Sequence, residues 1–349
     1  MKPELLELLR GPIDCSALTL QNPQYDRDEI MAGELIDRSG NGYPIENGIP
    51  RLIIDDEREQ QQTADSFGYK WGQRDTYESE SFIRFRTHWF LERYGFSSEE
   101  AMLQFFEHYP RIFDAGCGSG TTALLFMRPR STFTWYGLEI SSAIDVAKTK
   151  LADFANTHFI QGNMLHAPFA PNCFDLILAH GTLHHTRSTR EALHHLSSFL
   201  RPGGQFLFYV YRKKGPIREF ADDYIREQIR DLPAQGAWEA LRPLTQLGKT
   251  LAELKTNVTI EEDIPMLGIP KGTFDIQRFL YWNFIKMFWN ESLSFEENLH
   301  VNFDWYHPHY AHRQTEEEIR AWCDECQLEI TYLREEESGF SVRAKKRDH

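Results

Sequence analysis

The 349-residue sequence has little cysteine and no long hydrophobic run. Its cysteines are odd in number and scattered, at positions 15, 117, 173, 323 and 326, which argues against a disulfide framework and favours a reducing, cytoplasmic location. No stretch approaches the roughly 18 apolar residues of a membrane span. The first residues, "MKPELLELLRGPIDC", place acids inside a short apolar stretch, so we do not expect a signal peptide.

Positive charge is also scarce. The chain has 38 Lys and Arg against 52 Asp and Glu, which gives a net charge of −14. Such a chain has no general field that attracts phosphate backbones, so we expect no DNA partner and argue against RNA, for which a local basic patch would be needed. Hydrophobic residues make up 41% of the chain, enough for a substantial core.

A third absence concerns the glycine-rich stretch "FDAGCGSGTTALLF", in which no lysine follows the glycines. A phosphate-binding loop needs G-x-x-x-x-G-K-[ST], so a nucleoside triphosphate is excluded. The spacing of Asp114, Gly116, Gly118 and Gly120 is one residue tighter than the dinucleotide motif, and an acid directly before the turn would repel a diphosphate. A cationic, phosphate-free ligand such as S-adenosylmethionine is compatible with that acid.

Strands and helices alternate from residue 111 onward, which predicts a doubly wound α/β fold with a mostly parallel sheet. Helical spacing of apolar residues marks the stretches between the strands, and Ser188 and Thr315 each begin a helix with an acid three residues later. The expected strands are Arg111–Asp114, Thr132–Glu139, Thr157–Gln161, Phe174–His180, Gln205–Tyr211, Leu328–Leu333 and Gly339–Ala344.

Taken with its context, "FDAGCGSG" resembles the nucleotide-binding turn of class I S-adenosylmethionine-dependent methyltransferases. "YGLEIS", "IQGNML", "FDLILAHGTLHH" and "FLRPGGQFLF" match later strand ends and turns of that family in the right order. The resemblance covers about residues 66–210 and 303–349 and is strongest to the small-molecule, ubiquinone-biosynthesis-like branch. It implies a seven-stranded Rossmann-like methyltransferase sheet and S-adenosylmethionine as cofactor.

The resemblance also implies a set of cofactor-binding residues. In the family, the acid at the Glu139 position binds the ribose hydroxyls, the amide or acid at Asn163 meets the adenine amino group, and Met164 packs on the ring. Tyr69, Trp71 and Arg74 either close over the cofactor or merely pack. The full expected set is Asp114, Gly116, Gly118, Gly120, Glu139, Ile140, Asn163, Met164, His180, Tyr69 and Trp71.

Five segments are expected along the chain. Residues 1–56 form a β-rich module that resembles a degenerate zinc-ribbon-like module: only Cys15 remains of the paired cysteines, so no metal is expected there. Residues 57–100 form a helical segment, and 101–211 the first part of the methyltransferase core. Residues 212–313 are an insertion that we interpret as a helical cap over the acceptor pocket, with an extra core or a dimer surface as the alternative. Residues 314–349 complete the core.

Histidines near the end of the fourth strand are candidates for a general base. Imidazole titrates near neutrality and could take a proton from a hydroxyl acceptor. We expect His184, His185 or His307 to act in this way, and otherwise to pack. His307, His309 and His312 lack a carboxylate or thiol partner at a known ligand spacing, so no metal is expected.

A second polar cluster, "NFDWYHPHYAHRQT", and the aromatic run "DIQRFLYWNFIKMFW" supply expected substrate contacts. These are Trp282, Asp304, Tyr306, His309 and Arg313. The stretch after the fourth strand lacks the motifs of amino- and cytosine-methylating nucleic-acid enzymes. The favoured function is therefore methyl transfer from S-adenosylmethionine to a small-molecule or glycan acceptor, as O-methylation with a histidine base. The alternatives are a tRNA or protein methyltransferase and a non-catalytic cofactor binder.

Overall fold

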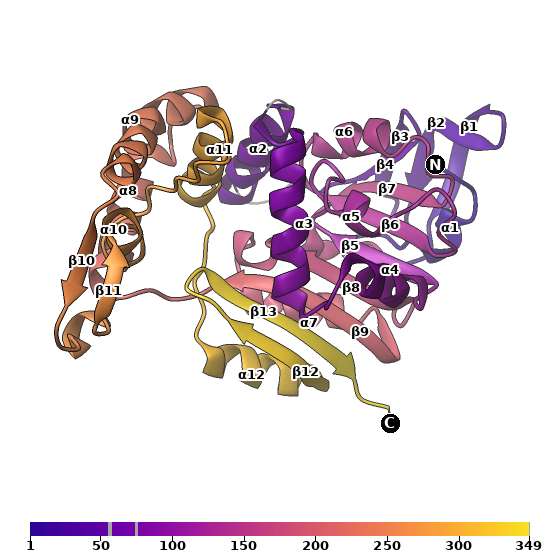
Figure 1. Ribbon diagram of the computed structural model, residues 1–349. Coiled ribbons are helices and arrows are strands. Elements are labelled where there is room, and N and C mark those ends of the chain that lie inside the picture. The colour runs from indigo at the N-terminus through magenta and orange to yellow at the C-terminus, as the bar shows by residue number, and fades with distance from the viewer. Residues whose placement is uncertain (55–57, 74–75, 349) are drawn as a thin grey trace.

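The computed structural model describes residues 1–54, 58–73 and 76–348. Its centre is a large mixed sheet in the order β1-β2-β3-β4-β7-β6-β5-β8-β9-β13-β12. Helices cover the sheet, and a second lobe, made of the 212–313 insertion, lies beside it (Figure 1). The α/β Rossmann-like fold expected from the alternating pattern is confirmed.

The predicted strands all form, with small shifts at their ends. β5 (Arg111–Ala115), β6 (Thr134–Glu139), β7 (Thr157–Gly162), β8 (Phe174–His180) and β9 (Leu200–Tyr211) are parallel to their neighbours. β13 (Gly339–Lys346) is antiparallel to β9, and β12 (Leu328–Glu335) pairs with β13. Fully buried side chains such as Phe113 and Ile177 explain why these strands read as continuous apolar runs.

The predicted number of strands, seven, was too low, because the sheet has eleven strands in the described residues. β1 (Thr19–Asp26), β2 (Glu29–Ile36), β3 (Gly42–Glu46) and β4 (Ile49–Leu52) form an antiparallel meander. β4 then pairs in parallel with β7, Arg51 opposite Gln161. This pairing joins segments about a hundred residues apart, so no local pattern indicates it.

The N-terminal module, which resembles a zinc ribbon in sequence, has polar side chains where paired cysteines would be expected. Cys15 is exposed, and the Asp37 carboxylate accepts hydrogen bonds from Asn41 and Tyr43. Within the described ranges, no group of three or more His, Cys, Asp or Glu side chains could hold a metal ion. The zinc-ribbon comparison stays a prediction, and its boundary at residue 56 lies outside the described residues.

Helices before and between the strands complete the core. Ser79 and Ser98 cap α3 and α4, and Thr315 and Glu318 form a reciprocal capping box on α12. α3 runs across the sheet in Figure 1, and α2 lies between the core and the insertion. The helices of this part are α1 (Leu5–Leu8), α2 (Arg58–Gly72), α3 (Glu80–Tyr94), α4 (Glu99–Glu107), α5 (Ala123–Phe126), α6 (Ala143–Lys150), α7 (Thr189–Ser197) and α12 (Glu316–Glu325).

Residues 212–313 hold four helices in the part that the structure describes, together with a β-hairpin that was not predicted from the sequence. Its helices are α8 (Pro216–Ile229), α9 (Ala234–Glu253), α10 (Ile276–Asn283) and α11 (Phe295–Tyr306), and the hairpin pairs β10 (Asn257–Ile260) with β11 (Gly272–Asp275). α9 and α11 pack on Tyr209 and Tyr211 of β9 through one apolar cluster. None of the helices in the described ranges is long and apolar enough to cross a membrane.

Candidate functional site

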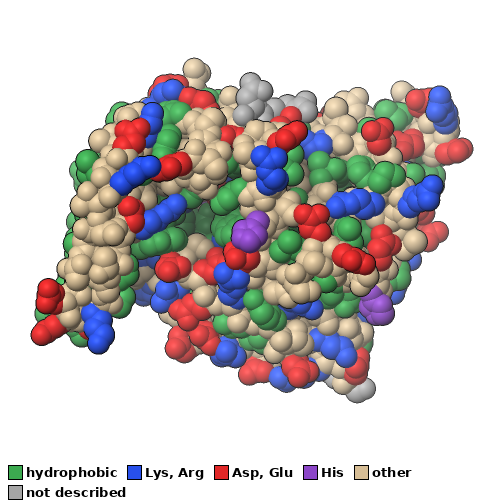
Figure 2. Space-filling view, in the orientation of Figure 1, with side chains coloured by type: hydrophobic (Ala, Val, Ile, Leu, Met, Phe, Trp, Pro, Cys, Tyr) green, Lys and Arg blue, Asp and Glu red, His purple; other side chains and the backbone are tan. Residues whose placement is uncertain are grey.

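A cavity of about 510 Å³ lies between the insertion and the carboxyl ends of the parallel strands. This is the edge at which open α/β sheets bind ligands. Figure 2 shows the surface hollowed there, with hydrophobic side chains inside. α2, α3, β6, β9, α10 and α11 all contribute to the lining. The volume falls within the range of about 300–1,000 Å³ that is usual for small-molecule sites.

The glycine turn after β5 borders this cavity. Gly116 and Gly118 have φ values of +79° and +54°, which side chains rarely tolerate. A Cβ on Gly116 would lie 2.6 Å from Thr182 Cγ2, and one on Gly118 would lie 2.8 Å from Trp71 Nε1. The turn therefore has to be glycine, and its backbone is open to close approach by a ligand.

Glu139 at the end of β6 supports the turn and lines the cavity. Its carboxylate accepts hydrogen bonds from the Gly118 N–H at 3.0 Å, and from the N–H and hydroxyl of Ser141 at 2.9 and 2.7 Å. Burial raises the pKa of this carboxyl despite these donors. An acceptor-only group at this place suits the two hydroxyls of a ribose.

The other expected cofactor residues lie in the cavity wall, within the glycine turn or beneath it. Ile140, Asn163, Met164 and His180 line the cavity together with Gly116, Glu139 and Trp71. Gly118 and Gly120 lie within the turn, and Gly120 packs against Leu151 and Ala147. Asp114 is buried beneath the turn, where burial raises its pKa to about 7 and the Trp135 indole N–H donates to it at 3.3 Å.

The aromatic lead-in residues separate in the structure. Trp71 faces the cavity, whereas Tyr69 packs on Trp238 and Phe303, with ring centroids 5.9 Å away in each case. Arg74 lies outside the described residues. The glycine backbone, the Glu139 carboxylate and the Asn163 amide together form a donor and acceptor set that fits the adenosyl part of S-adenosylmethionine.

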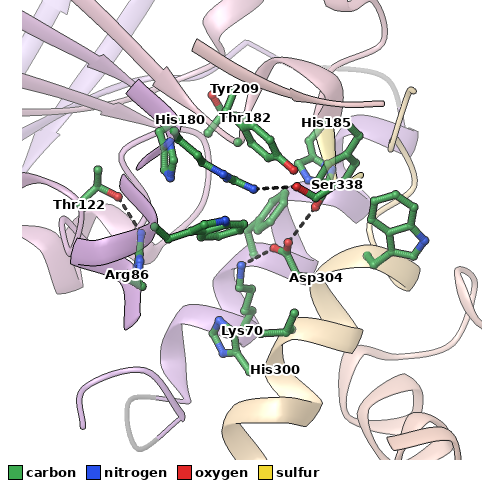
Figure 3. A pocket seen from close by; sticks show the side chains of 18 of the residues that line it. Lys70, Arg86, Thr122, His180, Thr182, His185, Tyr209, His300, Asp304 and Ser338 are labelled. Atoms are coloured by element: carbon green, nitrogen blue, oxygen red, sulfur yellow. Dashed lines mark hydrogen bonds and ion pairs between the residues drawn. The ribbon is translucent and has the colours of Figure 1, made fainter. Parts of the chain in front are cut away.

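Asp304 of α11 occupies the centre of the cavity. It pairs with Lys70 of α2, and its Oδ2 accepts from the Tyr211 hydroxyl at 2.9 Å (Figure 3). Lys70 outweighs burial and holds the pKa of Asp304 well below its usual range. Asp304 was predicted to contact substrate, and the structure brings it close enough to His185 for the two groups to interact electrostatically.

The three candidate bases are placed differently. His185 lines the cavity, and its Nδ1 lies 2.7 Å from the Tyr310 carbonyl oxygen. His184 lies outside the lining and stacks on Tyr211 at 3.7 Å between ring centroids. His307 also lies outside it, with Nδ1 2.7 Å from the Ser66 hydroxyl and Nε2 3.0 Å from a backbone carbonyl. The structure therefore brings only His185 of these three to the cavity wall.

The expected substrate residues divide in the same way. Trp282 and Asp304 line the cavity. The Tyr306 hydroxyl lies 2.9 Å from Asp222, and Arg313 pairs with Glu219 and Asp223, so both serve packing within the insertion. The backbone N–H of His309 donates to Gln62, and its side chain does not line the cavity.

Cations in the cavity wall were missed from the sequence. Arg86 of α3 donates to the Thr122 hydroxyl at 2.8 Å beside the glycine turn, and burial lowers its pKa to about 10. Lys70 and Lys286 line the wall as well. Lys70 stands between Tyr69 and Trp71, and Lys286 interrupts the aromatic run of the insertion. A lysine with aromatic residues close on both sides is the signal that could have identified both lysines.

Comparison with known proteins finds similarity to methyltransferases over part of the chain. The family model described as "Methyltransferase domain" matches residues 109–276. A fatty-acid O-methyltransferase of Mycolicibacterium smegmatis is 30% identical over 126 residues, which cover 36% of this chain and 44% of the relative. A ubiquinone/menaquinone biosynthesis C-methyltransferase of Vibrio cholerae is 29% identical over 122 residues, 33% of this chain and 46% of the relative. The chain spans about half or less of the length of the curated relatives it matches.

Solved structures of low sequence identity also match. The N1-methyltransferase of 1,6-didemethyltoxoflavin from Burkholderia thailandensis, solved with its substrate and S-adenosylhomocysteine, is 12% identical with a TM-score of 0.41, covering 93% of this chain and 99% of that one. The CurJ carbon methyltransferase is 14% identical with a TM-score of 0.40, covering 72% and 53%. The predicted methyltransferase domain and its cofactor S-adenosylmethionine are confirmed by the family match.

Proposed function

Since residues 109–276 are an S-adenosylmethionine-dependent methyltransferase domain, we propose that the chain methylates a small-molecule acceptor held between that domain and the 212–313 insertion. The observation that carries this proposal is the cavity itself. Its wall combines the glycine turn and Glu139 at one end with aromatic side chains of the insertion, such as Tyr281 and Trp282, at the other. A site walled on both sides in this way suits a small molecule better than a polymer such as a glycan, tRNA or protein.

Several residues would hold the cofactor. Glu139 would accept from the ribose hydroxyls, Asn163 would meet the adenine edge, and Met164 would pack on the ring. Arg86, whose guanidinium lies beside Thr122 near the turn, would pair with the carboxylate of the methionine end. The bound cofactor supplies a methyl group on a sulfonium, which leaves by in-line displacement, so the protein acts mainly by aligning donor and acceptor.

The acceptor would be a hydroxyl or another protonated group, with His185 as the proton acceptor. The Tyr310 carbonyl can only accept a hydrogen bond, so His185 Nδ1 carries the hydrogen and Nε2 keeps its lone pair. Nε2 has no hydrogen-bond partner in the described structure. Burial lowers the pKa of His185 to about 4, which keeps it neutral, and the nearby Asp304 carboxylate stabilises the imidazolium formed on proton transfer.

Relatives with small-molecule acceptors support the same proposal. The matched protein of Mycolicibacterium smegmatis is named for a fatty acid, and that of Vibrio cholerae for quinone biosynthesis. The net charge of −14 is also unfavourable for a polyanionic acceptor such as tRNA.

Transfer of labelled methyl from S-adenosylmethionine into fractionated extracts tests this function. We expect label in the small-molecule fraction with the unmodified chain, and none with Glu139→Ala, which removes the ribose acceptor. Glu329→Ala, on an exposed position of β12, is the matched control and should behave as the unmodified chain. Label in high-molecular-weight RNA or protein would overturn the proposed acceptor class, and S-adenosylhomocysteine binding without any transfer would indicate a non-catalytic binder.

A further inference from the structure

Three cations surround the Trp305 indole at the insertion side of the cavity. Lys286 Nζ lies 4.6 Å from the centroid of the indole, Arg218 Cζ 5.5 Å and Lys214 Nζ 5.9 Å. All three side chains line the cavity. Three like charges around one ring repel one another, and burial strengthens the repulsion. The cluster is therefore unfavourable unless anions offset it.

The protein supplies few anions to this cluster. Asp222 is buried, and its Oδ2 accepts from Arg218 Nε at 2.7 Å and from the Trp305 indole N–H at 2.8 Å. Lys214 Nζ donates to backbone carbonyls, including that of Ser338 at 3.0 Å, and these carry no charge. One carboxylate in direct contact thus faces three cations.

Lys286 is the member of the cluster whose ammonium has, among the described residues, no hydrogen-bond or ion-pair partner and lies only over the face of the Trp305 ring. Its side chain is buried, with 6% of the residue exposed, and it faces the cavity. In the part of the chain that the structure describes, its Nζ makes no hydrogen bond and no ion pair. Burial lowers its pKa to about 7, although Asp304 and Asp222 act in the opposite direction. A buried ammonium without a hydrogen-bond or ion-pair partner is costly, and binding of an anion would reduce that cost.

Aromatic side chains make up part of the wall around the cluster. Tyr281, Trp282 and Phe288 line the same part of the cavity. Lys214 Nζ also lies 5.8 Å from the Trp282 ring. Flat apolar side chains around a free cation complement a ligand that carries one anionic group on an aromatic or similarly flat body.

We propose that Lys286, together with Lys214 and Arg218, binds an anionic group of the acceptor, which makes the acceptor an aromatic carboxylate or phosphate. This inference rests on the proposed function, because it places the acceptor in the same cavity. The anionic group is an anchor and not the methylated atom, since the cluster belongs to the insertion whereas His185 and the glycine turn belong to the core. The anchor orients the opposite end of the acceptor toward the methyl donor.

Three probes that share one naphthalene ring separate charge from shape, and the carboxylate and the amide among them are nearly equal in size. 2-Naphthoate, 2-naphthyl phosphate and the neutral 2-naphthamide are titrated by calorimetry into the full-length chain saturated with S-adenosylhomocysteine. We expect at least one of the two anions to bind at least about tenfold more tightly than the amide, and the stronger anion identifies the class.

Variants then assign the preference to Lys286. Lys286→Met should reduce the anion preference to less than about threefold, while Lys286→Arg should retain most of it. Lys213→Met removes the same charge from an exposed neighbouring position outside the cavity and should change nothing. Affinity for S-adenosylhomocysteine, measured on the same samples, should be equal in all four proteins and shows that each variant is folded.

Equal binding of anions and amide by the unmodified chain, or an anion preference that survives in Lys286→Met, would overturn the anchor. Failure of the unmodified chain to bind S-adenosylhomocysteine would instead overturn the proposed function. The two failures are therefore distinguishable in one experiment.

Discussion

The two ends of the cavity are built in opposite ways. At the core end, a continuous stretch of chain forms the glycine turn, and Glu139 accepts hydrogen bonds from residues close to it in the fold. At the insertion end, the segment before α8, α8 itself and the segment between α10 and α11 contribute one cation each around Trp305 of α11. The first end is built from backbone groups and the Glu139 carboxylate with Arg86 beside them, and the second gathers three cations around one ring.

This difference corresponds to two different tasks. Recognition of the cofactor needs a backbone shape, which glycines close in sequence can specify locally. Recognition of an acceptor needs side chains of chosen charge, which can come from any element that reaches the cavity. A chain with a net charge of −14 has nonetheless placed several buried cations at one end of one cavity.

The largest expected effect comes from His185, where the two ends meet. We expect His185→Gln to lower the rate constant of methyl transfer, kcat, by a factor of about 10²–10⁴, because proton removal from the acceptor is lost. The acceptor is the small-molecule fraction that takes up label. His194→Gln, on the exposed face of α7, is the control and should leave kcat unchanged.

The pH profile sharpens that prediction. The base acts in its neutral form, and its pKa is lowered to about 4, so kcat should stay level as the pH falls from about 8 to 5 and decline only toward 4. The charged groups that act on it are Asp304, Lys70 and Arg226. An acid limb near pH 6.5 that disappears in His185→Gln would contradict the buried, neutral histidine.

A smaller effect is expected at Arg86, which tests the core end alone. We expect Arg86→Met to weaken S-adenosylhomocysteine binding about tenfold, through loss of a charge-assisted hydrogen bond to the carboxylate. Binding of 5′-methylthioadenosine, which lacks that carboxylate, should not change. Arg84→Met, at an exposed position on the same helix, is the control in calorimetric titrations. Equal weakening of both ligands would show that Arg86 only supports the turn.

The smallest expected effect concerns stability at the insertion end. Lys286→Met should raise the free energy of unfolding near pH 7 by about 1–3 kcal/mol, because an unpartnered buried cation is removed. Burial lowers the pKa of Lys286 from 10.5 to about 7 in the folded chain. The penalty is therefore complete below pH 7 and declines as the pH rises toward 10.5.

Urea unfolding near pH 7 and near pH 9 measures both parts of this prediction. The advantage of Lys286→Met should be smaller at the higher pH. A variant that is less stable than the unmodified chain at pH 7 would contradict an unpartnered cation. The charged groups that face Lys286 are Asp304, Asp222, Arg218, Lys70 and Lys214.

The core could be predicted because its signals are local. The buried runs Phe174–His180 and Thr157–Gln161 have strand length and apolar composition, and the glycine spacing after Asp114 specifies the turn. The joining of β4 to β7 could not be predicted, because it depends on backbone pairing between distant segments. The β10–β11 hairpin was missed because its strands are short and half exposed.

Candidate site residues show the same limit. Glu139 ends one strand and Asn163 follows the next, the family resemblance implied their roles, and the structure places both at the cavity. The polar cluster at residues 302–315 was predicted as one site, but helix α11 directs Asp304 into the cavity and turns Tyr306 toward Asp222. Side chains two positions apart on a helix point to different sides, so adjacency in sequence does not make a common site.

Residue order alone was sufficient for the strands of the core and the glycine turn, because each depends on periodicity or spacing within a short stretch, and the resemblance of its ordered motifs to a known family implied the cofactor. The pairing of Lys70 with Asp304, the position of Arg86 beside Thr122 and the cations around Trp305 arise only when distant elements pack together. The physical reason is that electrostatic interaction depends on distance in space and on burial. Both are set when the insertion closes over the core.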